Sequence, residues 1–221
     1  MDKKGLMSAV VIFGLVLIVA GFEIWSMISE NYPIVNFPPK GSVIVAFGDS
    51  LTEGVGASSP EHGYVPILEK RLGVSIINKG VRADTTAQAL ARLDDVLVLK
   101  PNTVIVFLGG NDMIQRVPRA TTFANLTTII TRIHKEGAVV LLIGLDGLIG
   151  NAYEKDFAAL AKQTGCLYVP NIMNGIIGNS TLLSDEVHPN DAGYLKIADR
   201  VAFTLEGVTS VMPRGEFKTL E

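Results

Sequence analysis

The stretch Val43-Ile44-Val45-Ala46-Phe47-Gly48-Asp49-Ser50-Leu51 joins a short apolar run to a glycine and two polar residues. A continuous apolar run with β-branched members is typical of a strand that is buried on both faces, as in a parallel sheet. Gly48 permits a tight turn after this strand, which leaves the hydroxyl of Ser50 exposed at the start of a helix. A serine here is also a good helix N-cap, so the stretch alone leaves both roles open.

Apolar runs and segments of helical periodicity alternate along the rest of the chain. Strands are predicted at 74–77, 103–108, 138–143 and 167–169, and helices at 65–72, 85–99, 123–134, 153–162 and 190–205. This alternation indicates a parallel sheet with helices on both faces. We therefore expect an α/β protein, a three-layer α/β/α sandwich with a mostly parallel five-stranded sheet.

Length, charge and cysteine content exclude several classes of protein. The 221 residues suit one domain, and the formal net charge of −3 comes from interspersed acids and bases. Nucleic-acid binding is disfavoured because it requires a clustered positive face. The single cysteine, Cys166, excludes an internal disulfide and a cysteine-based metal site.

The N-terminal segment has the composition of a membrane helix. No charge occurs from Gly5 to Phe22, and these eighteen residues span about 27 Å as a helix, close to the thickness of a bilayer core. Lys3 and Lys4 precede the segment, which favours a cytoplasmic N-terminus and an exported remainder. We favour a single uncleaved anchor at 5–28 that holds the exported remainder at the cell membrane. A cleaved signal peptide with a secreted or periplasmic product, or a buried core helix, stays possible.

Prolines separate this segment from the domain. We expect residues 1–4 in the cytoplasm, a stiff Pro-rich linker at 29–41, a folded domain at 42–206 and a C-terminal tail at 207–221.

Polar residues follow several predicted strands at the point where each strand ends. Ser50 follows the first strand, Ala83 the second and Asn111 the third, while Asp185 and His188 lie in the loop before the last helix. Because ligand sites of parallel sheets lie beyond the carboxyl ends of the strands, these residues are expected at one edge.

The spacing of Asp185 and His188 is suited to general-base catalysis. A carboxylate three residues before a histidine can hold one ring nitrogen protonated, which leaves the other to accept a proton from a serine. A metal site is the rival use of Asp-x-x-His, but it needs further ligands, and His62 and His134 are poorly placed to supply them. Asn111 offers an amide donor for an oxyanion, although Gly-Gly-Asn-Asp is also good turn composition.

Three motifs together resemble those of the SGNH (GDSL) hydrolases in order and spacing. They are Gly48-Asp49-Ser50-Leu51, Gly109-Gly110-Asn111-Asp112 and Asp185-Glu186-Val187-His188-Pro189. The run from Asp49 to Gly56 is similar to that of the bacterial multifunctional thioesterase, arylesterase and lysophospholipase group. The resemblance implies a flavodoxin-like SGNH fold, Ser50 as nucleophile, His188 as general base and acid, and Asp185 as its orienting partner.

The same resemblance implies an oxyanion hole built from Ser50, Ala83 and Asn111. The family usually has glycine where this chain has Ala83; alanine keeps the main-chain N–H, but a positive φ there would strain it. Arg82 beside it adds a cation at the rim, which is either solvated, as we favour, or a contact for anionic substrates.

The sequence therefore predicts a serine esterase that cleaves carboxylic esters, thioesters or lysophospholipids without a cofactor or metal. Two alternatives keep the fold: a cell-envelope O-acyltransferase that uses the same triad, and a non-catalytic binding module. The partners expected for this protein are a small-molecule substrate and, through the N-terminal helix, the membrane. Nucleic acid is not expected as a partner.

Overall fold

A computed structural model describes residues 32–146 and 152–212. Among these residues, those from Ile34 onward form one compact unit. The predicted anchor at 5–28 lies outside the described residues, as do residues 213–221 of the predicted tail. Within the described residues, none of the helices combines the length and the hydropathy that crossing a membrane requires.

The centre of the unit is a five-stranded sheet in which every neighbouring pair is parallel. Its strands are β1 (Ile44–Gly48), β2 (Ile76–Gly80), β3 (Thr103–Phe107), β4 (Val139–Ile143) and β5 (Leu167–Val169), in the spatial order β2-β1-β3-β4-β5. The predicted α/β class and sheet are thus confirmed. The order reverses direction between β1 and β3, and such a switch point is where ligand sites form.

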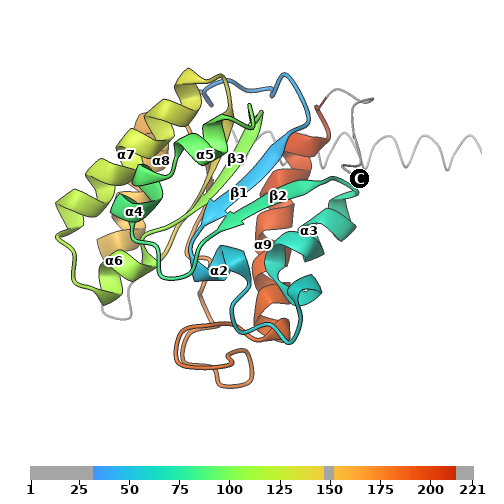
Figure 1. Cartoon of the computed structure of the whole chain (residues 1–221), viewed down its shortest axis with the longest axis vertical. Coiled ribbons are helices and arrows are strands. Elements are labelled where there is room, and N and C mark those ends of the chain that lie inside the picture. Colours follow the sequence, from blue (N-terminus) through green and yellow to red (C-terminus); the bar gives the residue numbers. More distant parts are fainter. Residues whose placement is uncertain (1–31, 147–151, 213–221) are drawn as a thin grey trace, which may run out of the picture. The chain divides into compact units, whose positions relative to one another are not determined.

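Helices cover both faces of the sheet. They are α2 (Ser50–Glu53), α3 (Tyr64–Leu72), α4 (Thr86–Ala91), α5 (Asp94–Leu97), α6 (Gly110–Ile114), α7 (Arg119–Lys135), α8 (Ala152–Thr164) and α9 (Asp191–Thr209), with a short 3₁₀ helix η1 at Pro60–His62. Figure 1 shows α3 and α9 on one face and α4 to α8 on the other. This is the doubly wound arrangement that the right-handed crossover of parallel strands produces.

The core lies between these layers. Every residue of β1, β3 and β4 is buried, which explains why their sequences are apolar without alternation. The largest buried aromatic side chains, including Tyr64, Phe107 and Tyr194, fill the space between sheet and helices.

The single helix predicted over 85–99 is wrong. The chain forms α4 and α5 instead, separated at Arg92, whose φ of −106° and ψ of 11° leave the helical region. After the break, Leu93, which precedes α5, and Val96, which lies within it, are both buried in the core, while the Arg92 side chain contacts Asp84.

The segment before β1 is attached to the domain. The Val35 N–H donates to the Gly165 carbonyl at 2.9 Å, and the Asn36 side-chain amide donates to the carbonyls of His134 and Ala138 at 2.8 and 3.0 Å. The compact unit therefore starts within the stretch that the sequence assigns to a linker.

Two glycines let α2 approach the ends of β1 and β2. A Cβ atom on Gly48 would meet the Thr52 hydroxyl at 2.0 Å, and one on Gly80 would meet the backbone nitrogen of Glu53 at 2.1 Å. Only a residue without a side chain fits either position, so these glycines allow α2, which begins at Ser50, to lie directly against the ends of β1 and β2.

Gly80→Ala should destabilise the fold, because its new Cβ overlaps backbone atoms that cannot rotate away. We expect a loss of about 1–3 kcal/mol in the free energy of unfolding, measured by urea denaturation. Gly110→Ala is the matched control, since its Cβ would find its nearest neighbours at 3.7 Å. Equal effects of the two substitutions would contradict this packing argument.

Candidate active site

Ser50 is the first residue of α2 and is 7% exposed. The preceding residue, Asp49, caps the helix by accepting a hydrogen bond from the Leu51 N–H at 3.0 Å. On the inner side of α2, the Thr52 hydroxyl lies 3.1 Å from the Tyr64 phenol oxygen and anchors the helix to the core. The N-cap role that the sequence left open thus belongs to Asp49, and the Ser50 hydroxyl faces other partners.

A chain of hydrogen bonds joins the serine to a carboxylate. The distance from Ser50 Oγ to His188 Nε2 is 3.1 Å, and that from His188 Nδ1 to Asp185 Oδ2 is 2.7 Å. The structure therefore brings together three residues whose sequence positions span 50 to 188. Each ring nitrogen has one partner, which is the arrangement that proton transfer from a serine requires.

The loop that carries His188 is closed on itself. Leu183 and Pro189 form an isolated β-bridge, and the Ser184 N–H donates to the His188 carbonyl at 2.9 Å. Gly56 packs against this turn, because a Cβ there would lie 2.3 Å from the Ser184 hydroxyl and 3.0 Å from His188 Cβ. The glycine-containing loop after α2 thus holds the imidazole beside Ser50.

Asp185 is held as a carboxylate by backbone donors. The N–H groups of Val187 and His188 donate to its Oδ1 at 2.9 and 2.8 Å. These bonds, followed by the one from the imidazole, lower the pKa of Asp185 to about 2. The group stays ionised at any physiological pH and can hold His188 in one orientation.

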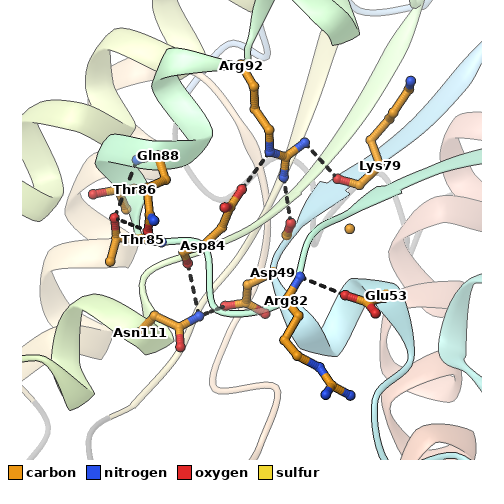
Figure 2. A network of polar contacts seen from close by, with 12 residues as sticks. Asp49, Glu53, Lys79, Arg82, Asp84, Thr85, Thr86, Gln88, Arg92 and Asn111 are labelled. Atoms are coloured by element: carbon orange, nitrogen blue, oxygen red, sulfur yellow. Dashed lines mark hydrogen bonds and ion pairs between the residues drawn. The ribbon is translucent and has the colours of Figure 1, made fainter.

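Asn111 is the second residue of α6. Its side-chain amide donates to the Asp84 carbonyl at 2.9 Å and, over a longer 3.3 Å, to Asp49 Oδ2 (Figure 2). The amide thus joins the loop after β2 to the turn after β1.

Ala83 lies in a turn that strains it. The Asp84 N–H donates to the Val81 carbonyl at 3.2 Å, which closes a four-residue turn with Ala83 in third position at a φ of 65°. This left-handed conformation costs an L-residue about 1–2 kcal/mol relative to glycine. The strain anticipated for alanine at this position is therefore present. The Arg82 side chain next to it is exposed, and Figure 2 shows it directed away from Asp84 and Asn111.

Sequence reasoning missed the charged residues beneath this turn. Arg92 contacts Asp84 at 2.6 Å, and the buried Asp112 accepts hydrogen bonds from the Thr86 N–H and the Thr122 hydroxyl at 2.8 and 3.2 Å. In the sequence, Asp112 is next to Asn111, and Arg92 lies within a segment with a helical apolar pattern. Those were the available signals, but neither indicates a partner by itself.

Asp49 is the most perturbed acid near the site. It is 2% exposed, and this desolvation raises its pKa from 3.8 to about 7, against the opposing effects of the Leu51 N–H and of His188. A buried carboxyl group that is partly protonated near neutral pH therefore lies beside Ser50 and Asn111.

A second group of serine, histidine and aspartate occurs on the surface. Ser58 Oγ lies 2.8 Å from His62 Nδ1 and 2.6 Å from Asp191 Oδ2, and His62 Nδ1 is itself 3.0 Å from Asp191. One ring nitrogen faces both partners here, so the imidazole cannot relay a proton between them. Nowhere in 32–146 or 152–212 do three or more His, Cys, Asp or Glu side chains gather as a metal site would require.

Comparison with known proteins identifies the family. The model of the GDSL-like Lipase/Acylhydrolase family matches residues 46–196, which contain every site residue described above. The chain belongs to this family. As a GDSL/SGNH protein it is an ester hydrolase by descent, and its all-parallel sheet is the SGNH-like fold.

Characterised GDSL relatives share most of the chain. Esterase TesA of Pseudomonas aeruginosa is 30% identical over an alignment of 177 positions, which covers 74% of this chain and 87% of the relative. The Thioesterase 1/protease 1/lysophospholipase L1 of Escherichia coli strain K12 is 30% identical over an alignment of 172 positions, which covers 74% of this chain and 83% of the relative. A crystal structure of TesA, 31% identical, aligns with a TM-score of 0.69 over 75% of this chain and 99% of its own.

Burial of Asp49 predicts a specific pH dependence of stability. A pKa raised from 3.8 to about 7 means that the folded state binds a proton at Asp49 more tightly than the unfolded state does. This proton binding stabilises the fold fully below pH 3.8, and the stabilisation is lost as the pH rises through 7. The free energy of unfolding of the wild type minus that of Asp49→Asn should therefore fall by up to roughly 4 kcal/mol between pH 4 and pH 8. Urea denaturation at a series of pH values measures it. A difference that does not vary with pH would show that the carboxyl group is not perturbed.

Proposed function

We propose that this protein is a serine hydrolase that cleaves carboxylic esters or thioesters through an acyl-enzyme on Ser50. The observation that carries the proposal is the unbroken hydrogen-bond chain from Ser50 Oγ through His188 to Asp185, at 3.1 and 2.7 Å. It lies at the switch point of the sheet, next to an amide donor on Asn111.

The first step follows from this geometry. Ser50 Oγ attacks the acyl carbon while His188 Nε2 takes the hydroxyl proton, and the ionised Asp185 stabilises the imidazolium that results. His188 then gives the proton to the leaving alcohol or thiol. In the second step His188 takes a proton from water as the water attacks the acyl carbon. The bond from Ser50 Oγ to the acyl carbon then breaks, His188 returns the proton to Ser50, and the acid is released.

The developing oxyanion requires donors that are fixed before the reaction. The main-chain N–H groups of Ser50 and Ala83 and the side-chain amide of Asn111 fill this role in the proposal. Asn111 has one short bond, to the Asp84 carbonyl at 2.9 Å, and a longer one to Asp49 at 3.3 Å. The longer bond is the one that the amide exchanges for the substrate oxygen.

The substrate class is supported by the relatives. The names of two of them, an esterase and a thioesterase with lysophospholipase activity, cover oxygen esters, thioesters and lysophospholipids. We extend this class of acyl substrates to the present chain. The apolar N-terminal segment 5–28 supports a location of the enzyme at the bacterial membrane, on its extracytoplasmic side.

The purified protein should hydrolyse p-nitrophenyl butyrate. Ser50→Ala removes the nucleophile and should lower kcat by at least about 10³-fold, whereas Asn111→Ala, which removes one oxyanion donor, should lower kcat by about 10²–10³-fold. Release of p-nitrophenol measures both, and an acyl thioester assayed in parallel compares the two leaving groups.

Ser58→Ala is the matched control, because Ser58 belongs to the surface group in which one histidine nitrogen faces both partners. Its kcat should stay close to that of the wild type. Equal activity of Ser50→Ala and the wild type would refute the proposal. If p-nitrophenol release depended on Ser50 but the acyl group passed to an added sugar, the enzyme would be an acyltransferase instead.

A further inference from the structure

The Arg92 guanidinium lies at the meeting point of three backbone segments (Figure 2). Its Nε donates to Asp84 Oδ2 at 2.6 Å, and its two terminal nitrogens donate to the carbonyls of Lys79 and Gly48 at 3.1 and 3.0 Å. Its central carbon lies 4.6 Å from the centre of the Phe47 ring. One side chain thus joins the ends of β1 and β2 to the loop that follows β2.

These contacts favour a structural role for Arg92 over direct binding of an anionic substrate. Each guanidinium nitrogen already donates to a protein oxygen, and the side chain is 19% exposed. The planar fork of arginine matches three acceptors at fixed positions, which a lysine ammonium on a flexible stem cannot do.

The loop that Arg92 holds has a strained conformation of its own. Ala83 has a φ of 65°, and the turn around it is attached through the Val81 N–H, which reaches the Gly48 carbonyl at 3.1 Å, and the Arg82 N–H, which reaches Glu53 at 2.7 Å. Asp84 ends the turn: its side chain accepts from Arg92, and its carbonyl accepts from Asn111.

We propose that Arg92 is a positioning residue of the oxyanion hole, which holds the strained Ala83 turn and, through Asp84, the Asn111 amide in place. This inference rests on the proposed function, in which Ala83 and Asn111 donate to the oxyanion. Arg92 does not touch the reacting atoms. It fixes two donors relative to Gly48, and therefore relative to Ser50, which follows two residues later.

The test is a set of four proteins: wild type, Arg92→Met, Ala83→Gly and the double variant. Oxyanion donors that are out of place weaken the stabilisation of the transition state more than they weaken substrate binding. Arg92→Met should therefore lower kcat by about ten- to a hundredfold and change KM by less than about threefold. Ala83→Gly removes the strain of the turn, so adding it to Arg92→Met should restore part of the lost kcat. Ala83→Gly alone should change kcat less than Arg92→Met does.

Two further variants separate positioning from general stability. Arg71→Met removes an exposed ion pair with Asp199 and should leave kcat unchanged. Arg92→Lys keeps the charge but should remain closer to Arg92→Met than to the wild type. All rates are compared at a temperature well below the melting temperature of each variant. If Arg92→Met lowered only the melting temperature, or if Ala83→Gly gave no recovery, the proposal would be overturned.

Hydrogen exchange tests the positioning without any assay of activity. Exchange of the backbone amides of 81–85 should become faster in Arg92→Met than in the wild type and slower again in the double variant, while β3 and β4 stay protected. Unchanged exchange in 81–85 would overturn the proposal. If the wild type showed no Ser50-dependent hydrolysis, the proposed function would be refuted. Hydrogen exchange of 81–85 would then still decide whether Arg92 holds the turn.

Discussion

The Gly48 carbonyl accepts two hydrogen bonds, from the Val81 N–H at 3.1 Å and from Arg92 at 3.0 Å. Gly48 ends β1 two residues before Ser50, and no side chain fits at its Cα. The turn that presents the serine and the loop that presents Ala83 therefore share one fixed point. In the proposed mechanism, the same backbone atom therefore helps to place both the nucleophile and the oxyanion donors before a substrate arrives.

Opposite this fixed point, the imidazole is held by a separate set of contacts. The bridge between Leu183 and Pro189 closes its loop, and the tight approach of Gly56 sets its distance from α2. Asp185, kept ionised by two backbone N–H groups, orients the ring. The site thus has two halves, one on the strand ends and one before α9, which meet at the Ser50 hydroxyl.

Strand positions and the edge where the site residues gather were predictable, because buried parallel strands have continuous apolar sequences and their carboxyl ends meet at one edge. The break of the helix at Arg92 was not, since it depends on acceptors at Gly48 and Lys79 that are distant in sequence. The burial of Asp49 depends on the same tertiary packing. Local patterns predicted the elements and the polar residues that gather at this edge of the sheet, but not the charged residues Arg92 and Asp112 that support them.

The identity of the nucleophile is tested most directly by covalent labelling with a p-nitrophenyl alkylphosphonate, followed by mass spectrometry of the intact chain and of its peptides. A phosphonate forms a stable adduct with a serine that a neighbouring imidazole activates and that faces an oxyanion hole. The geometry predicts one adduct per chain, on Ser50, and its loss in His188→Ala. An adduct on Ser58, or no adduct on a folded wild-type protein, would show that the hydrogen-bonded chain from Ser50 to Asp185 does not form an active site.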